Sequence, residues 1–392
     1  MNKRKIMDNI FWMGVIDWNR RLFDGMIPIP DGTSYNAYLI EGSEKTALID
    51  TVESEWSETL MKQLSNVKKI DFVISNHAEQ DHSGSIPNVL EKYPESILIC
   101  SLKAKDLLTA HLKIDAERIQ TVEDGEVLSL GNWTLKFIYT PWVHWPETMS
   151  TYLQEEKILF SCDFFGSHMA TTELFAGNNQ QISDAAKRYY AEIMMPYRKI
   201  VQKNLDIVKN FDIKYIAPSH GPIYDEPEFI ISKYEDWSSD NVKNLVVIPY
   251  ISMHGSTKEM VEYLASALAD KDIRYEIFEL NVSDIGKLAM ALVDAATVVI
   301  GTPTVNVGPH PKAVYVASVM SVLKPKLKYA AVIGSFGWTA HAAQNICDII
   351  SNLKLEMLGN VSVKGVPTAS TYKELDALAD IIAGKHYSLM SK

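Results

Sequence analysis

The sequence predicts an α/β protein of two domains, residues 1–243 and residues 244–392. Short apolar runs of strand length alternate with helical stretches along the chain, and the alternation becomes regular after residue 244. A chain of 392 residues is also long enough to bury two hydrophobic cores. We therefore expect a mixed sheet layered with helices, followed by a doubly wound parallel sheet.

The composition argues against several classes of protein. A net charge of −11 disfavours nucleic-acid binding, which depends on basic surfaces. No run of about 18 apolar residues occurs, so we expect no membrane span. The three cysteines are far apart, which argues against a disulfide framework and favours a cytoplasmic protein. Residues 1–21 lack the cleavage site of a signal peptide, and we expect them to form the first strand.

Six runs in the first half have the length and composition of strands. They are YNAYLI (35–40), KTALIDT (45–51), DFVISN (71–76), SILIC (96–100), TLKFIYT (134–140) and KILFSCD (157–163). In the second half, strands and helices alternate at a spacing that suits parallel crossovers. The strand-like runs there are NLVVIPY (244–250), RYEIFELN (274–281), AATVVIGTPT (295–304), KYAAVIGSFGW (328–338) and NVSVKGVPT (360–368).

Between the first two runs of the second half, residues 257–270 predict an amphipathic helix, because Met260, Leu264 and Leu268 lie four residues apart. The polar stretch DWSSDNVKN (236–244) has no periodicity, and we place the linker between the two halves there.

The stretch NHAEQDHSG (76–84) follows a strand-like run and carries four strong metal ligands within six positions: His77, Glu79, Asp81 and His82. A loop at the end of a strand usually has one or two polar residues. This density of donors indicates a metal site.

Three more candidate ligands also follow strand-like runs: His144, Asp163 and His220. Strand ends are where open sheets gather functional side chains. The seven residues supply four imidazoles and three carboxylates, enough for two ions, and we expect Asp163 to bridge them. The remaining histidines outside the phosphate loop described below are expected to be structural: His111, His168, His310, His341 and His386.

This pattern resembles the metallo-β-lactamase superfamily, whose zinc hydrolases carry H-x-H-x-D-H and later His, Asp and His. The chain departs from the pattern at one position, where Glu79 stands in place of the second histidine. Because an anionic oxygen donor replaces a neutral imidazole, the site is shifted from zinc toward iron.

In the second half, the loop SMHGST leads from a strand into a helix, and its backbone amides and hydroxyls suit a phosphate. It lacks the lysine of a Walker A loop and the G-x-G-x-x-G of dinucleotide folds, which favours a monophosphate. Its residues are Ser252, Met253, His254, Gly255, Ser256 and Thr257. Two later loops, TPTVN and SFGW, follow strands at the same sheet edge and comprise Thr302, Pro303, Thr304, Val305, Asn306, Ser335, Phe336, Gly337 and Trp338.

The three loops resemble those of flavodoxin, where the first holds the FMN phosphate and the other two embrace the isoalloxazine ring. Trp338 also has an alternative reading as a packing residue. Taken alone, the first loop is equally consistent with an ordinary turn between a strand and a helix.

A β-lactamase-like half with this glutamate, followed by a flavodoxin-like half, resembles the flavodiiron proteins, or A-type flavoproteins, over nearly the whole chain. The resemblance includes IDWN (16–19), YNAYLI (35–40), HWPE (144–147), DFFGSHMA (163–170) and YYAEIMMPY (189–197). It implies an N-terminal αββα sandwich of the metallo-β-lactamase type and a flavodoxin-like C-terminal domain with FMN and two irons.

Carried over to this sequence, the resemblance gives one iron to His77, Glu79 and His144 and the other to Asp81, His82 and His220, with Asp163 bridging them. Two neighbouring positions depart from the family: Glu147 stands where aspartate is common, and Cys162 stands where asparagine is common.

The resemblance further implies a reductase of dioxygen to water, of nitric oxide to nitrous oxide, or of both. No rubredoxin-like or further flavin domain follows residue 392, so we expect electrons from a separate rubredoxin or reductase. Tyr190, His168 and Trp145 are expected near the pocket, and a head-to-tail homodimer, or a dimer of such dimers, would pair each FMN with the irons of the other chain.

Two alternatives remain open on the sequence. A dinuclear zinc hydrolase fused to a flavodoxin-like module would hydrolyse an ester or thioester without an electron donor. A flavin electron carrier with a vestigial metal domain would leave the complete ligand set without a purpose.

Overall fold

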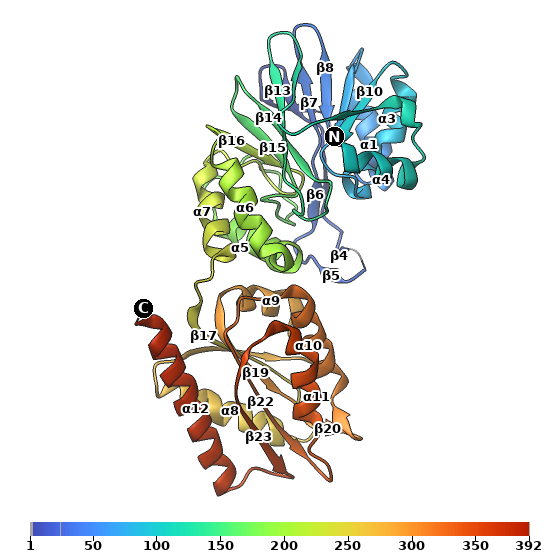
Figure 1. The fold of residues 1–392 in the computed structure, drawn as a ribbon. Helices are drawn as coiled ribbons and strands as arrows, with labels where there is room; N and C mark the ends of the chain where they lie inside the picture. Colours follow the sequence, from blue (N-terminus) through green and yellow to red (C-terminus); the bar gives the residue numbers. More distant parts are fainter. Residues whose placement is uncertain (1–2, 24, 392) are drawn as a thin grey trace. The chain divides into compact units, whose positions relative to one another are not determined.

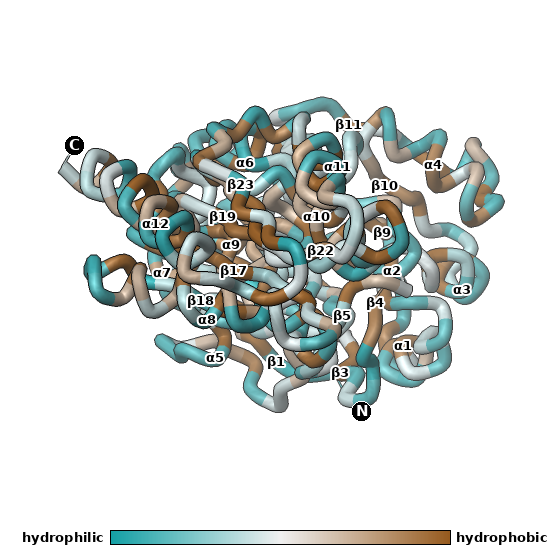
Figure 2. The backbone as a smooth tube through the Cα atoms, turned by 90° about the horizontal axis from the view of Figure 1, so that it is seen from below, coloured by the Kyte–Doolittle hydropathy of each residue, from teal (hydrophilic) through white to brown (hydrophobic). Residues whose placement is uncertain are grey.

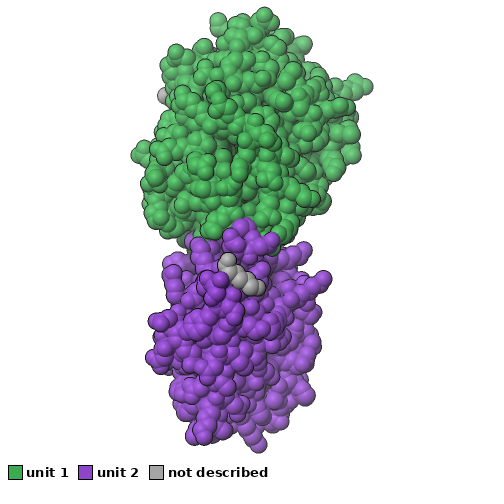
Figure 3. Space-filling view, turned by 60° about the vertical axis from the view of Figure 1, so that its left-hand side comes forward, with its two compact units in different colours: residues 1–190, 197–238 green, residues 191–196, 239–392 purple. Residues whose placement is uncertain are grey.

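The computed structural model describes residues 3–23 and 25–391. The chain divides into two compact units, one of residues 1–190 and 197–238 and the other of residues 191–196 and 239–392 (Figure 3). Within the described ranges, no helix is both long and apolar enough to cross a membrane.

The first unit contains two main sheets (Figure 1). The seven-stranded sheet has the order β1 (Arg4–Met7), β2 (Ile10–Trp12), β7 (Tyr38–Glu41), β8 (Thr46–Ile49), β9 (Phe72–Ser75), β10 (Ile97–Ser101) and β11 (Ile119–Val122). The five-stranded sheet has the order β12 (Val127–Ser129), β13 (Thr134–Tyr139), β14 (Met149–Leu153), β15 (Ile158–Cys162) and β16 (Tyr215–Pro218). Two small antiparallel pairs join β3 (Val15–Asp17) to β6 (Thr33–Tyr35) and β4 (Leu22–Phe23) to β5 (Ile27–Pro28).

Alternating side chains place the seven-stranded sheet between two cores. On β7, β8 and β9, Leu39, Leu48 and Val73 belong to one core, and their neighbours Ile40, Ile49 and Ile74 belong to the other. This is the two-residue period of a strand that is buried on both faces. The first core includes residues of the helices α1 (Ser57–Gln63), α3 (Ile86–Lys92) and α4 (Leu102–Leu112), and the second contains the inner face of the five-stranded sheet.

The helices α5 (Gln180–Tyr189), α6 (Arg198–Val208) and α7 (Pro227–Ser238) lie beside β15 and β16 (Figure 1). The unit is therefore the layered αββα sandwich that was predicted. The prediction of one strand over residues 1–21 is wrong, because its described part forms β1, β2 and β3. Gly14 lies between β2 and β3, where a Cβ would meet the Tyr35 carbonyl oxygen at 2.4 Å, so only glycine fits there.

The second unit is a five-stranded, wholly parallel sheet in the order β18 (Arg274–Glu279), β17 (Lys243–Tyr250), β19 (Ala295–Gly301), β22 (Tyr329–Phe336) and β23 (Glu356–Lys364). In chain order this is 2-1-3-4-5, the flavodoxin arrangement, so the predicted doubly wound sheet is confirmed. A short hairpin of β20 (Thr304–Val305) and β21 (Gly308–Pro309) follows β19.

Helices cover both faces of this sheet. One core contains residues of α9 (Ile285–Asp294), α10 (Pro311–Leu323) and α11 (Ala342–Ile349), and the other contains residues of α8 (Ser256–Ala269) and α12 (Ala369–Met390). The predicted stripe of Met260, Leu264 and Leu268 is fully buried in the second core. Figure 2 colours the central strand β19 and helix α9 toward the hydrophobic end of its scale.

The predicted linker at 236–244 is too long. Helix α7 continues to Ser238 and β17 begins at Lys243, so only residues 239–242 lie between them. The helix continues because Trp237 is buried, with its ring 5.5 Å from that of Tyr190 and 5.4 Å from that of Tyr234.

Candidate metal centre and flavin-binding edge

All seven predicted metal ligands come together at one end of the sandwich. They follow strands of both sheets: His77 and Glu79 come after β9, His144 lies between β13 and β14, Asp163 follows β15, and His220 follows β16. The short helix α2 (Gln80–Ser83) carries Asp81 and His82. Because strand ends are held by two packed cores, the ligand positions are fixed by the fold rather than by a flexible loop.

The ligand atoms form two groups, and the Asp163 carboxylate belongs to the first and contacts two histidines of the second. In the first group, Glu79 Oε2 lies 3.1 Å from both His77 Nε2 and His144 Nε2, and Asp163 Oδ2 lies 3.4 Å from the same two nitrogens.

The second group surrounds the other oxygen of Asp163. His82 Nε2 and His220 Nε2 lie 3.1 and 3.4 Å from Asp163 Oδ1. Asp81 completes the group, with Oδ1 3.2 Å from His82 Nε2 and Oδ2 3.1 Å from His220 Nε2. One oxygen of Asp163 therefore faces each group, which is the arrangement that a bridging ligand requires.

These distances match the edges of a metal coordination shell. Ligand atoms about 2.1 Å from an ion, separated by tetrahedral or octahedral angles, lie about 3.0 to 3.4 Å from each other. The spacing in both groups agrees with that range, so each group fits one ion of this size.

Unsatisfied polar atoms provide an independent test of the fit. Both carboxylate oxygens of Asp81 and of Asp163, and both ring nitrogens of His82, are buried and make no hydrogen bond to any described residue. A buried carboxylate without donors is costly by several kcal/mol unless a cation neutralises it. The residues present therefore fit bound cations.

Two of the histidine ligands are oriented by hydrogen bonds at the ring nitrogen that faces away from the ligand group. His77 Nδ1 donates to Glu147 Oε1 at 2.6 Å, and His220 Nδ1 donates to the Ser34 carbonyl oxygen at 2.7 Å. Such hydrogen bonds fix the tautomer and leave the Nε2 lone pair for a metal. Burial raises the pKa of Glu147, but the hydrogen bond and charge of His77, together with the backbone amide of Ala78, outweigh burial and lower the pKa.

The carboxylates make the site attractive to cations. Burial lowers the pKa of His82, but Asp163 and Asp81 outweigh it and raise the value to about 9. Burial also lowers the pKa of His144, but Asp163 and Glu79 outweigh it and raise the pKa to about 9. Divalent ions would displace the protons that these imidazoles otherwise hold.

The two groups differ in exposure. The side chains of His144 and Glu79 are 15% and 11% exposed, whereas those of Asp81, His82 and His220 are at most 3% exposed. A small molecule therefore reaches the first group directly, and the second group is enclosed.

The residues that surround the metal ligands differ in part from those predicted. His168 lies against His220, with ring centroids 4.7 Å apart, and Trp145 lies 5.0 Å from His77. Tyr190 packs instead on Tyr234 and Trp237, and its neighbour Tyr189 is the tyrosine beside His168 and His220, at 4.9 and 5.8 Å.

Ser34 could not be identified because its contribution is a backbone carbonyl, which any residue has. Thr33, whose Oγ1 lies 2.9 Å from His168 Nδ1, is 135 positions away from its partner. Glu147 could be noticed in the sequence as a carboxylate three residues after His144, but its hydrogen-bond partner is His77.

The three predicted flavin loops lie at the carboxyl edge of the parallel sheet. Residues 252–257 join β17 to α8, residues 302–306 follow β19, and residues 335–338 end β22 and continue beyond it. Thr257 and Ser335 connect the first and third loops, with their hydroxyl oxygens 3.2 Å apart. Gly255 has φ 95°, and open space surrounds the position of a Cβ there.

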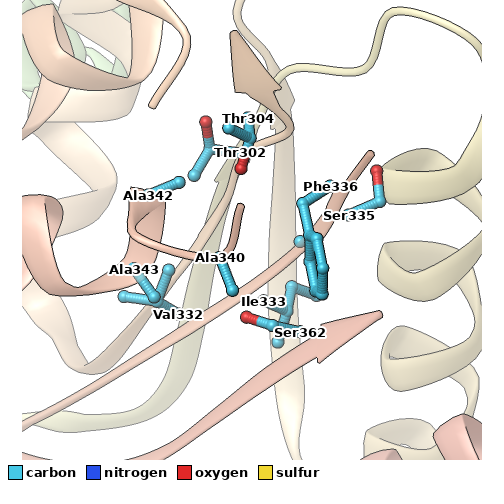
Figure 4. A pocket seen from close by; sticks show the side chains of 11 residues that line it. Thr302, Thr304, Val332, Ile333, Ser335, Phe336, Ala340, Ala342, Ala343 and Ser362 are labelled. Carbon is cyan, nitrogen blue, oxygen red and sulfur yellow. The ribbon is translucent and has the colours of Figure 1, made fainter. Parts of the chain in front are cut away.

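A shallow hollow that opens to solvent lies between the second and third loops. Figure 4 shows Thr302, Thr304 and Ala342 on one side of it and Ser335 and Phe336 on the other, with Ala340 between them. No side chain in the described part of the chain caps the N-terminus of α8, so its first amide groups remain available to an anion. Met253 and Trp338 are 51% and 77% exposed, so Trp338 does not pack in the core.

Comparisons with known proteins agree with both halves. Residues 33–221 match a family model described as ODP family beta lactamase. The chain is 35% identical to the nitric oxide reductase of Moorella thermoacetica over 97% of this chain and 98% of that protein. It is 34% identical to the rubredoxin-oxygen oxidoreductase of Megalodesulfovibrio gigas over 98% of each, and 32% identical to the coenzyme F420H(2) oxidase of Methanothermobacter marburgensis over 95% of each.

Two solved structures have the same architecture. The rubredoxin oxygen:oxidoreductase from Desulfovibrio gigas superposes with a TM-score of 0.96 at 31% identity and covers 100% of both chains. The flavodiiron protein from Giardia intestinalis superposes with a TM-score of 0.92 at 26% identity, over 99% of this chain and 98% of the other.

Proposed function

Because the chain belongs to the flavodiiron protein family, whose members are oxidoreductases, we propose that it reduces dioxygen to water, nitric oxide to nitrous oxide, or both. His77, Glu79 and His144 would hold one iron, Asp81, His82 and His220 the other, and Asp163 both. When bound, the irons would supply one-electron redox chemistry, and FMN on the three loops of the second unit would supply the electrons.

The composition of the two ligand groups is the observation that carries this proposal. Each group has two histidines and one carboxylate of its own, plus one oxygen of Asp163. Two histidines with one carboxylate are the usual ligands of non-haem iron that reacts with oxygen. A histidine in place of Glu79 would give the first group three imidazoles, as in many zinc enzymes.

The residues around the ligands support a redox role. Glu147 and the Ser34 carbonyl hold the rings of His77 and His220, so those ligands need little rearrangement when the charge of an ion changes. The slight exposure of Glu79 and His144 would admit a diatomic molecule to the first group, while the burial of Asp81, His82 and His220 keeps bulk water from the second.

Metal content, flavin content and products test the proposal together. Anaerobically purified protein should contain about two irons and one FMN per chain, and its reduced form should consume dioxygen or nitric oxide without releasing hydrogen peroxide. The matched variant Glu79→His should take up more zinc relative to iron when both are offered. Two zinc ions and hydrolysis of an ester or thioester without a donor would favour the alternative, a zinc hydrolase fused to a flavodoxin-like module.

A separate electron donor is part of the proposal. The names of the relatives include rubredoxin and coenzyme F420H(2), which supports a small redox protein or a reduced cofactor as the donor. Rapid reduction of the flavin by rubredoxin, followed in a stopped-flow instrument, would identify the protein donor. Reduction only by a reductase or a deazaflavin would reject it.

We further propose a head-to-tail homodimer, or a dimer of such dimers, in which the FMN of one chain serves the irons of the other. The metal ligands and the flavin loops belong to different compact units, which supports such pairing. His77→Ala chains and Ser256→Ala, Thr257→Ala chains, inactive alone, should recover roughly a quarter of wild-type activity when refolded together at random. No recovery despite demonstrated mixed dimers would reject crossed pairing.

A further inference from the structure

His168 is a buried histidine that lies against the metal centre and belongs to neither ligand group. It is only 2% exposed, and three aromatic rings pack around it. The ring centroids of His220, Tyr189 and Phe23 lie 4.7, 4.9 and 5.0 Å from its own. Because its burial keeps bulk water away, a hydrogen bond made by this ring is stronger than one made in water.

Thr33, on β6, determines which nitrogen of His168 carries the ring hydrogen. Its hydroxyl oxygen lies 2.9 Å from His168 Nδ1 and 3.3 Å from the Ser34 carbonyl oxygen. That carbonyl already accepts from His220 Nδ1 at 2.7 Å, so the closer Nδ1 of His168 is the better acceptor for the hydroxyl. Because Nδ1 accepts this bond, the ring hydrogen of His168 is on Nε2.

The Nε2 hydrogen of His168 has no acceptor in the described part of the chain. The nitrogen is buried and makes no hydrogen bond to any described residue, which is costly for a donor. Burial and the charge of His220 lower the pKa of His168. The carboxylates of Asp163 and Glu79 act in the opposite direction, so both lie close enough to affect the ring. An unpaired donor is thus held beside the two ligand groups.

We propose that His168 Nε2 donates a hydrogen bond to a small anion, or to an atom of the substrate that gains negative charge, at the metal pair. A donor that is fixed in a site without bulk water stabilises such charge without having to rearrange. Thr33 supplies the fixing contact, and the surrounding rings exclude the water. His168 is then a catalytic residue, in contrast to the structural role expected from the sequence.

The competing role for His168 is support of the ligand His220, whose ring lies against it. That support already comes from the Ser34 carbonyl, which accepts from His220 Nδ1. A supporting residue would affect how firmly the metals are held, whereas a donor to bound anions would affect anion binding at unchanged metal content. The inference rests on the proposed function, because an anion is held there only when the metal pair is filled.

Azide, a small anion, tests the inference on the full chain loaded with iron and FMN. The infrared stretch of bound azide reports both its affinity and its hydrogen bonding. His168→Phe keeps a ring but removes the donor, so azide should bind roughly 10- to 150-fold more weakly, and its stretch should shift. His168→Gln retains an N–H donor and should recover most of the affinity. His111→Phe, at an exposed histidine, is the matched control and should bind azide as the wild type does.

Metal analysis and competition with a chelator, made on the same samples, separate the outcomes. Equal azide affinity in wild type and His168→Phe, at equal iron content, would overturn the role of His168 and leave the metal pair intact. A loss of chelator resistance that accounts for the weaker azide binding would also overturn it, because His168 would then act by supporting the ligands. A wild-type chain that holds no iron would overturn the proposed function itself. His168→Met, which also lacks a donor, takes the place of the phenylalanine variant if that protein does not fold.

Discussion

The metal ligands are charged or ionisable side chains that are at most 15% exposed, whereas the flavin-binding edge consists of loops whose largest side chains, Met253 and Trp338, are 51% and 77% exposed. The first site brings three carboxylates together and leaves many of their oxygens without donors. The second uses backbone amides and hydroxyls, which are neutral and satisfied by water when nothing is bound. The difference teaches that the metal centre depends on its ions, while the flavin-binding edge persists without its ligand.

Removing the shared carboxylate should have the largest effect. In Asp163→Ala both groups lose a ligand at once, so metal content should fall well below one ion per chain and activity should drop by roughly a hundredfold or more. FMN should remain bound, because its loops lie in the other unit. Metal analysis measures the ion content, and flavin absorbance measures the bound FMN. Asp206→Asn, at an exposed carboxylate, is the control, and loss of flavin together with metal would contradict the independence of the two sites.

The converse change belongs to the flavin-binding edge. Ser256→Ala with Thr257→Ala removes two hydroxyls, and hydrogen bonds to a charged group contribute about 1.5 to 3 kcal/mol each. FMN affinity, measured by fluorescence titration, should therefore fall by roughly 150-fold or more, with metal content unchanged. Ser266→Ala, on the exposed side of the same helix, is the control. Unchanged FMN affinity would rule out a phosphate at this loop.

Glu147→Gln sharpens the comparison within the metal centre. The amide still fills the space but no longer accepts from His77 Nδ1 as a charged partner, so the first ion should be held about 10- to 100-fold more weakly. Competition with a chelator, followed by metal analysis, gives the ratio directly. Glu58→Gln, at an exposed glutamate, should match wild type; equal chelator resistance in both variants would show that Glu147 is dispensable.

The smallest effect concerns acid stability in the second unit. Burial lowers the pKa of His386 to about 4, and its ring bonds Thr297 Oγ1 at 2.7 Å and Asn244 Oδ1 at 2.8 Å. The unfolded chain binds the proton first, near pH 6.5, so this contribution to stability is complete above that pH and is lost as the pH falls toward 4.

The midpoint temperature of thermal unfolding, monitored by the release of flavin, should therefore fall by several degrees between pH 6.5 and pH 4. His386→Gln should weaken this dependence, whereas His341→Gln, at an exposed position, should leave it unchanged. A steeper dependence in His386→Gln would contradict the assigned sign.

The features that could be predicted from the sequence are those that depend on patterns within short segments of the chain. Strand runs with buried faces and the dense motif at 76–84 led to the architecture and to the ligands that the structure brings together. The rest depends on contacts between distant segments. The carbonyl of Ser34, which holds His220, and the hydroxyl of Thr33 have no distinguishing pattern in the sequence. The requirement for glycine at position 14 likewise arises from the Tyr35 backbone, which lies against it only in the folded chain.

The enclosure of the second ligand group has a consequence for how long each ion stays. Asp81, His82 and His220 have almost no contact with solvent, whereas His144 and Glu79 do. An ion in the first position can exchange while the protein remains folded, but one in the second must wait for a local opening of the surrounding helices and strands. The ratio of the ion residence times at the two positions should thus be set by the free energy of that opening. A chain stripped by a chelator should pass through a long-lived intermediate in which only the enclosed position is filled.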